Sequence, residues 1–194
     1  MQLNESETAI VLVEFQKQWT EKGLFNWLIR HQLESRDVVK NTRRLVTRAR
    51  ENGVTVVHAP LVVDSQSRKG WLAHLTFGRV FTRDTWRTEP VPGLFEEGDL
   101  IAYRRYYNFS AFDAFFNSGL EQILNEQGIK KIFICGFATN QCPAKTLRTA
   151  LRRGFDPYMV SDCTATFNGF FQGNTERKFR ERTVTSRELL AGLS

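Results

Sequence analysis

The sequence predicts an α/β protein of three layers, in which a mostly parallel central sheet of about six strands carries helices on both of its faces. Two observations lead to this fold. Short apolar runs alternate along the chain with stretches in which apolar residues recur at every third or fourth position. The apolar runs are continuous, as in strands that are buried on both faces. Strands and helices that alternate in this way imply right-handed crossovers and a parallel sheet.

The first half of the chain is expected to provide two strands and one helix. Residues 9–13 are a short apolar run, which indicates a buried strand. A helix is expected to begin at Ser35, because apolar residues then recur at three- and four-residue steps, and to end at Asn52-Gly53. Residues 54–57 indicate the second strand.

Residues 58–98 have a different pattern, in which aromatic residues such as Trp71 and Phe77 are interrupted by glycine and proline. A long irregular segment inside a compact domain is often a lid or a binding loop. A surface excursion that packs its own aromatic side chains would have the same composition. Both interpretations stay open at the level of the sequence.

The second half of the chain is expected to provide four further strands. They are expected at residues 100–103, 131–136, 156–161 and 183–185. Helices are expected at residues 142–153 and 186–193. The chain has no internal repeat, linker or low-complexity tract, so a single domain over residues 1–194 is expected.

A further helix is expected to follow the strand at residues 100–103. Ser110 is a good N-cap, and Asp113 stands three residues later, where it would complete a capping box. Gly119 is expected to divide this helix in two, and Gly128 to end it.

The composition is that of an ordinary globular protein. Of the 194 residues, 41% are apolar and 25% are charged. No apolar run approaches the roughly 20 residues that a membrane helix needs. The N-terminal residues lack the basic start and apolar stretch of a signal peptide. We therefore expect a cytoplasmic protein that does not bind membranes.

The charged residues and the cysteines narrow the function further. The net charge is +6, but no basic run is long and no nucleic-acid motif accompanies it, so we expect no nucleic-acid partner. The charge also fits an anionic small substrate. The odd number of cysteines, Cys135, Cys142 and Cys163, and the lack of CxxC spacing indicate neither a disulfide framework nor a zinc site.

Cys142 is the most informative of these residues. It lies between the expected strand at residues 131–136 and the helix that follows, and therefore at a helix N-terminus. The partial positive charge there should lower the pKa of the thiol, and the thiolate is the nucleophilic form. The carboxyl ends of parallel strands meet at one edge of a sheet. Glu14 and the pair Arg104-Arg105 follow two other strands, so an acid, a cation and a thiol are expected to converge there.

Four segments of the chain resemble the isochorismatase-like cysteine hydrolases, a superfamily that includes isochorismatases, nicotinamidases and carbamoylsarcosine-type amidohydrolases. The segments are residues 9–16, 107–112, 135–142 and 160–167. They read AIVLVEFQ, YNFSAF, CGFATNQC and VSDCTATF, and the resemblance extends over nearly the whole chain. It implies an isochorismatase-like domain with Rossmann-like topology.

The resemblance also implies a catalytic triad of aspartate, lysine and cysteine. By position, Glu14 stands at the aspartate and Cys142 at the nucleophile. The lysine falls within residues 104–106, where we choose Arg105 first and Arg104 second, while an ungapped match would choose Tyr106. Glutamate is the same base with one more methylene group. Arginine keeps the positive charge but cannot release a proton at ordinary pH.

With this triad, the resemblance implies attack of the Cys142 thiolate on an amide, imide or ureide carbonyl and a thioester intermediate. The backbone N–H groups of Ala138 and Cys142 would form the oxyanion hole. A cis peptide bond is expected between Ala138 and Thr139, as is frequent in this family. Five residues are expected to contact the substrate. They are Phe15, Trp19, Tyr107, Phe137 and Thr139.

The expected partner is a small molecule, and the resemblance implies a homodimer or homotetramer. Nicotinamidases carry an Asp-x-His-x-x-His metal site, which this sequence lacks, since Asp64 and His74 are too far apart to replace it. We expect no metal and no other cofactor. Two alternatives stay open: hydrolysis of an isochorismate-type vinyl ether, and a catalytically weak pseudo-hydrolase that binds a ligand.

Overall fold

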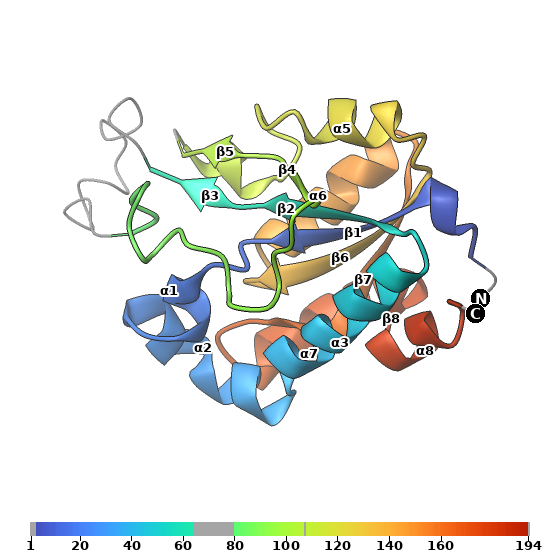
Figure 1. The fold of residues 1–194 in the computed structure, drawn as a ribbon. Helices are drawn as coiled ribbons and strands as arrows, with labels where there is room; N and C mark the ends of the chain where they lie inside the picture. Colours follow the sequence, from blue (N-terminus) through green and yellow to red (C-terminus); the bar gives the residue numbers. More distant parts are fainter. Residues whose placement is uncertain (1–2, 64–79, 107, 194) are drawn as a thin grey trace.

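The centre of the molecule is a sheet whose strands lie in the order β4-β2-β1-β6-β7-β8 (Figure 1). The computed structural model describes residues 3–63, 80–106 and 108–193. The strands of this sheet are β1 (Thr8–Val13), β2 (Thr55–Ala59), β4 (Leu100–Ile101), β6 (Lys131–Phe137), β7 (Asp156–Ala165) and β8 (Thr183–Val184). Each pairs with its neighbours in parallel, so the predicted parallel sheet is confirmed. A second, two-stranded sheet pairs β3 (Leu61–Val62) with β5 (Arg104–Arg105).

Helices pack on both faces of the sheet, which confirms the predicted three layers (Figure 1). The helices α2 (Leu24–Ser35), α3 (Val38–Glu51) and α8 (Ser186–Leu190) pack on the face of Leu12. The helices α5 (Leu120–Glu126) and α6 (Cys142–Arg152) pack on the face of Val13. The other described helices are α1 (Lys17–Thr20), α7 (Gly169–Lys178), η1 (Glu5–Glu7), η2 (Phe109–Phe112) and η3 (Arg180–Arg182). None of the helices in the described ranges has both the length and the apolar character required to cross a bilayer.

Two helix starts differ from the sequence prediction. Ser35 ends α2 and does not begin α3, because Asp37 adopts a left-handed conformation with φ of 51° that separates the two helices. Residues 109–112 form only the 3-10 turn η2, which Asn108 caps by accepting a hydrogen bond from the Ser110 N–H. The following α-helix, α5, begins only after Gly119, which has φ of 76°.

The helices α2 and α7 were not predicted. In α7 the period of the apolar residues is weak, because its buried residues are the polar Gln172 and Thr175. Such a helix does not show the apolar stripe by which helices are recognised in a sequence. The helix α2 does have this stripe, since Phe25, Leu28, Ile29 and Leu33 pack on the core at helical spacing, and the sequence prediction missed it.

Gly136 brings the ends of β1 and β6 together. It pairs with Val13 and has φ of 132°, and a Cβ atom at this position would overlap the Val13 carbonyl group. Only glycine permits this approach of two backbones. The residues that follow the two strands, Glu14 on one side and the loop to Cys142 on the other, therefore lie next to each other.

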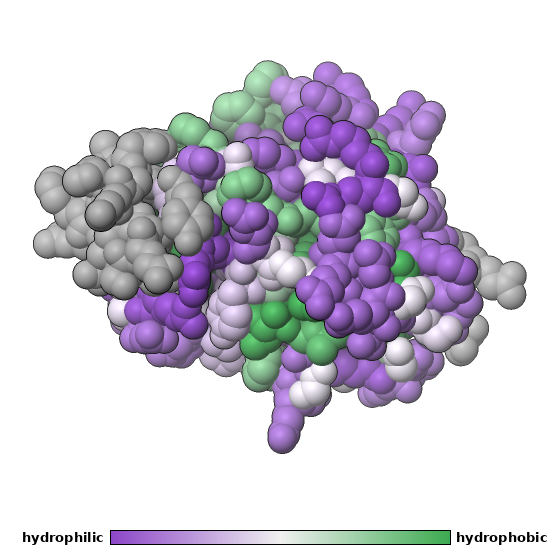
Figure 2. All heavy atoms as spheres, turned by 90° about the horizontal axis from the view of Figure 1, so that it is seen from above, coloured by the Kyte–Doolittle hydropathy of each residue, from purple (hydrophilic) through white to green (hydrophobic). Residues whose placement is uncertain are grey.

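The surface in Figure 2 is mostly hydrophilic, with separate hydrophobic areas between the charged and polar side chains. Most large apolar side chains of the described residues are instead in two buried clusters, one on each face of the sheet. Trp71 and Phe77, which belong to the segment expected to be either a lid or a surface excursion, lie outside the described residues.

Candidate active site

Glu14 stands at the point where β1 ends, in a left-handed conformation with φ of 61°. Its N–H donates to the Ala59 carbonyl of β2 at 3.2 Å. The side-chain amide of Gln16 then pairs with the backbone of Leu61, with both bonds near 3 Å. These bonds fix the turn after β1, and they hold the Glu14 side chain inside the protein, where it is 1% exposed.

Arg104 is the cation that lies beside Glu14. Its Nη2 atom donates to Glu14 Oε1 at 3.1 Å and to the Ala59 carbonyl at 2.7 Å, and its Nη1 atom donates to the Ala111 carbonyl at 2.9 Å. The Arg104 side chain is fully buried. An ion pair removed from water in this way is sustained only when such additional hydrogen bonds satisfy it.

Arg105, the first choice from the sequence, is exposed and does not contact Glu14. The reason is the alternation of side chains along an extended chain. Ala102, Arg104 and Tyr106 are buried, whereas Tyr103 and Arg105 point outward. This alternation was visible in the sequence as a small apolar residue, Ala102, two positions before Arg104, and it was the signal that would have identified the right arginine.

Cys142 is the first residue of α6, as the sequence predicted, and its buried thiol lies within the electrostatic influence of both Glu14 and Arg104. Its pKa is nevertheless raised, and the expectation of a lowered pKa was wrong. Burial is the main cause, and the negative charge of Glu14 adds to it, while Arg104 opposes both. The resting group is therefore a thiol beside a carboxylate that can accept its proton.

Trp19 completes the surroundings of Glu14. Its indole Nε1–H donates to Glu14 Oε2 at 3.1 Å, so that each carboxylate oxygen has its own donor. The indole ring is buried and stacks on the Phe137 ring, with 5.8 Å between the ring centroids. The Phe15 ring also packs on the Phe137 ring, with 4.7 Å between the centroids. These three aromatic residues were expected to contact the substrate. The structure buries all of them, and of these three described residues Trp19 is the one hydrogen-bonded to the carboxylate. The sequence did not indicate the hydrogen bond of Trp19.

The loop between β6 and α6 is held by hydrogen bonds at several points. The Thr139 N–H donates to the Ala165 carbonyl at 3.1 Å, and its hydroxyl donates to Gln172 of α7 at 2.7 Å. The expected cis bond between Ala138 and Thr139 was wrong, since no peptide bond of the described residues is cis. A trans bond avoids a cost of about 3 kcal/mol and leaves the Thr139 N–H bonded to β7.

The two N–H groups that were expected to form an oxyanion hole belong to Ala138 and Cys142. Within the described part of the chain, neither N–H group donates a hydrogen bond to the protein. For Cys142 this follows from its place in the first turn of α6, where N–H groups have no partner within the helix. Both groups therefore keep their donor for a ligand. Tyr107, the remaining predicted substrate contact, lies outside the described residues, as do Asp64 and His74.

The structure thus brings Glu14, Arg104 and Cys142 close together from three distant parts of the sequence. A buried carboxylate–guanidinium pair lies near a thiol at the start of a helix. This combination is suited to proton transfer from sulfur and to attack on a carbonyl group. In the described residues, no cluster of three or more His, Cys, Asp or Glu side chains has the arrangement of a metal site.

Comparisons with known proteins identify the family to which the chain belongs. Residues 8–187 match the model of the isochorismatase domain. The chain is 30% identical over 140 residues to a streptothricin hydrolase of Streptomyces noursei, which covers 70% of this chain and 43% of that protein. It is 24% identical over 181 residues to the ureidoacrylate amidohydrolase RutB of Rhizobium rhizogenes, which covers 84% of this chain and 72% of that protein. The chain therefore spans less than half the length of the streptothricin hydrolase.

A solved structure shares the fold over the whole chain. The cysteine hydrolase from Pseudomonas syringae pv. phaseolicola has a TM-score of 0.82 with 21% sequence identity, and the match covers 100% of this chain and 95% of that one. The family model matches the chain from the first residue of β1 to the second residue of α8. This chain belongs to the isochorismatase domain family, as its resemblance predicted.

Proposed function

We propose that the protein is a cysteine-dependent hydrolase that cleaves a carbon–nitrogen bond in a small amide, imide or ureide. The buried contact of Glu14, Arg104 and Cys142 is the observation that carries this proposal. It is supported by the names of two relatives, a streptothricin hydrolase and a ureidoacrylate amidohydrolase.

The reaction begins with transfer of the Cys142 proton to Glu14. Because burial raises the pKa of the thiol, the proton stays on sulfur until substrate is bound, and Glu14 is positioned to take it. Arg104 and the N-terminus of α6 stabilise the thiolate. The sulfur then attacks the carbonyl carbon, and the N–H groups of Ala138 and Cys142 hold the negative oxygen.

The carbon–nitrogen bond breaks when Glu14 gives its proton to the leaving nitrogen, and this step leaves a thioester on Cys142 and a free amine. Glu14 next takes a proton from water, and the resulting hydroxide attacks the thioester carbonyl. The carbon–sulfur bond breaks, Glu14 returns the proton to the departing sulfur, and the acid product leaves the restored thiol. Arg104 acts only through its charge in this cycle, because a guanidinium does not release its proton.

Trp19 is a positioning residue in this mechanism. Its indole holds Glu14 Oε2 while Arg104 holds Oε1, so the longer side chain of glutamate is fixed in one orientation. Stacking on Phe137 fixes the indole in turn. Glutamate thereby works from a position where the family usually has aspartate.

The proposal is tested by replacing Cys142 with alanine and measuring turnover of a panel of small amides, ureides and carbamoyl compounds. Cys163→Ala is the matched control, because it also removes a buried sulfur. We expect activity to fall at least about 1,000-fold in the first variant and to be retained in the second. Intact-mass spectrometry of the wild-type protein during turnover should detect the acyl adduct. Undiminished turnover by the Cys142→Ala protein would reject the mechanism.

A further inference from the structure

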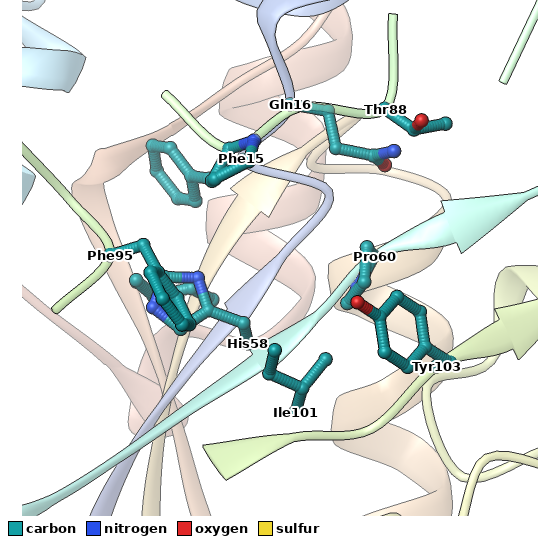
Figure 3. Close-up of a pocket in the computed structure, with 10 residues that line it drawn as sticks. Phe15, Gln16, His58, Pro60, Thr88, Phe95, Ile101 and Tyr103 are labelled. Carbon is teal, nitrogen blue, oxygen red and sulfur yellow. The ribbon is translucent and has the colours of Figure 1, made fainter. Parts of the chain in front are cut away.

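A cavity lies on the opposite face of the sheet from the Cys142 thiol. Leu12, His58 and Ile101 stand in one row across β1, β2 and β4, since Leu12 pairs with His58 and His58 pairs with Ile101. They form the floor of a cavity of about 200 Å³ (Figure 3). The residues that follow them, Val13, Ala59 and Ala102, turn to the opposite face and belong to the cluster of Cys142.

The roof and walls of the cavity are mainly apolar. Phe95 and Pro90 come from the segment before β4, Phe15 comes from the turn after β1, and Pro60 follows β2 (Figure 3). An apolar cavity of roughly 150 Å³ is large enough to bind one benzene ring. The present cavity therefore has room for a single aromatic ring and a small substituent.

Hydrogen bonds fix the segments that surround the cavity. The Val91 N–H donates to the Phe15 carbonyl at 3.1 Å, and Arg50 donates to the Leu94 carbonyl at 2.6 Å. Arg50 also pairs with Asp99 at 2.6 Å, and Asp99 accepts from the His58 ring at 3.0 Å. A ligand site fixed in this way needs no rearrangement before binding.

The His58 ring presents an apolar surface to the cavity, although the ring has two nitrogen atoms. Its Nε2 atom is hydrogen-bonded to Asp99, and burial lowers its pKa, so the ring is neutral near pH 7. The Phe95 ring lies against it at 5.3 Å, with an angle of 65° between the ring planes (Figure 3). Aromatic rings in such an arrangement favour a further ring packed beside them.

Tyr103 supplies a hydroxyl at the rim. It is 49% exposed, and Figure 3 shows its hydroxyl turned inward, toward Pro60. No hydrogen bond of this hydroxyl occurs among the described residues, and Arg83 lies over the ring at 5.6 Å. Arg83 is itself 4.0 Å from Asp84, whose negative charge offsets that of Arg83. A neutral polar group is therefore favoured there over an anion.

We propose that this cavity binds a neutral, single-ring aromatic compound with one hydroxyl or amide group, whose ring packs between Ile101 and Phe95 and whose polar group pairs with the Tyr103 hydroxyl. The site is separate from Cys142 and does not depend on the proposed hydrolysis. It gives the protein a second ligand position on the far side of β1 from the nucleophile.

The test is a titration of the protein with benzyl alcohol, followed by the amide NMR signals of Phe95, Ile101 and Tyr103. We expect saturable shifts of these signals, and weaker binding of benzoate and of cyclohexylmethanol. The same titration of the Cys142→Ala protein should give an unchanged affinity. Absence of saturable binding would overturn the proposal, and so would binding that is lost in the Cys142→Ala protein, because the ligand would then occupy the other site.

The role of the hydroxyl is tested with Tyr103→Phe, which keeps the ring. We expect the affinity for benzyl alcohol to fall about two- to tenfold, the usual effect of one hydrogen bond, and the affinity for toluene to stay the same. Tyr158→Phe, on β7 at the other end of the sheet, is the matched control and should change neither affinity. Equal affinities of wild type and Tyr103→Phe for benzyl alcohol would overturn the assignment.

Discussion

The replacement of Arg104 by methionine tests the central contact of the site. Methionine keeps much of the buried volume but removes the charge and the donors. The change leaves the Glu14 carboxylate buried without its cation, which costs about 3–5 kcal/mol in such pairs. It also removes a donor from each of two carbonyls, those of Ala59 and Ala111. The Ala59 carbonyl keeps the Glu14 N–H as a donor, whereas the Ala111 carbonyl loses its donor, which costs about 1–3 kcal/mol.

These costs overlap, because the protein relaxes around a single missing side chain, and we expect a loss of about 5 kcal/mol in the free energy of unfolding. That is a large part of the roughly 5–15 kcal/mol that stabilises a domain. Urea unfolding at pH 7 measures it. Arg105→Met is the matched control, and because Arg105 is exposed it should cost less than about 1 kcal/mol.

A double variant separates the lost charge pair from a general packing defect. Glu14→Gln removes the negative charge that Arg104→Met leaves uncompensated, so the two changes together should cost at least about 1 kcal/mol less than the sum of their separate costs. Strict additivity, or equal costs of Arg104→Met and Arg105→Met, would refute the conclusion that Arg104 is the partner of Glu14.

Single substitutions of Trp19, Cys142 and Gly136 test the site and the strands that position it. Trp19→Phe removes the second donor to the carboxylate, and it should lower kcat about three- to tenfold. Because burial raises the pKa of Cys142 in the folded protein, the stability that this thiol contributes is full below the ordinary thiol pKa and is lost as pH rises toward the raised value. Urea unfolding should therefore show a smaller loss of stability above about pH 8.5 in Cys142→Ala than in wild type. Gly136→Ala should destabilise the fold by at least about 2 kcal/mol, since its Cβ would overlap the backbone of β1. At Gly173 in α7, an added Cβ atom would have no contact within 4 Å outside its own helix backbone. Gly173→Ala should therefore be neutral or stabilising by up to about 1 kcal/mol.

Each of these predictions has an outcome that contradicts it. An unchanged kcat for Trp19→Phe would show that Trp19 does not position Glu14. Parallel stability curves of Cys142→Ala and wild type from pH 7 to pH 10 would show that the thiol does not resist ionisation in the folded protein. Equal stabilities of Gly136→Ala and Gly173→Ala would mean that β1 and β6 can separate at little cost.

The sequence by itself determined the architecture, and it determined where the strands and helices that position the site residues begin and end. Continuous apolar runs specify buried parallel strands, because strands covered on both faces have no polar side to alternate with. The same patterns placed Glu14 directly after β1 and Cys142 at the start of α6. The boundaries of β1, β2, β6 and α6 were predicted to within about two residues.

Only the tertiary structure decided which arginine pairs with Glu14 and that the Trp19 indole donates a hydrogen bond to the Glu14 carboxylate. It also decided that the pKa of Cys142 is raised by burial, although the thiol lies at a helix N-terminus. The outcome of each depends on the direction of a side chain or on its distance from water, and both are set by neighbours that are remote in the sequence. A one-residue change in the register of the chain after β4 would exchange Arg104 for Arg105, since successive side chains of an extended chain point to opposite sides. Local patterns specify the elements, while the chemistry of the site depends on how those elements are packed together.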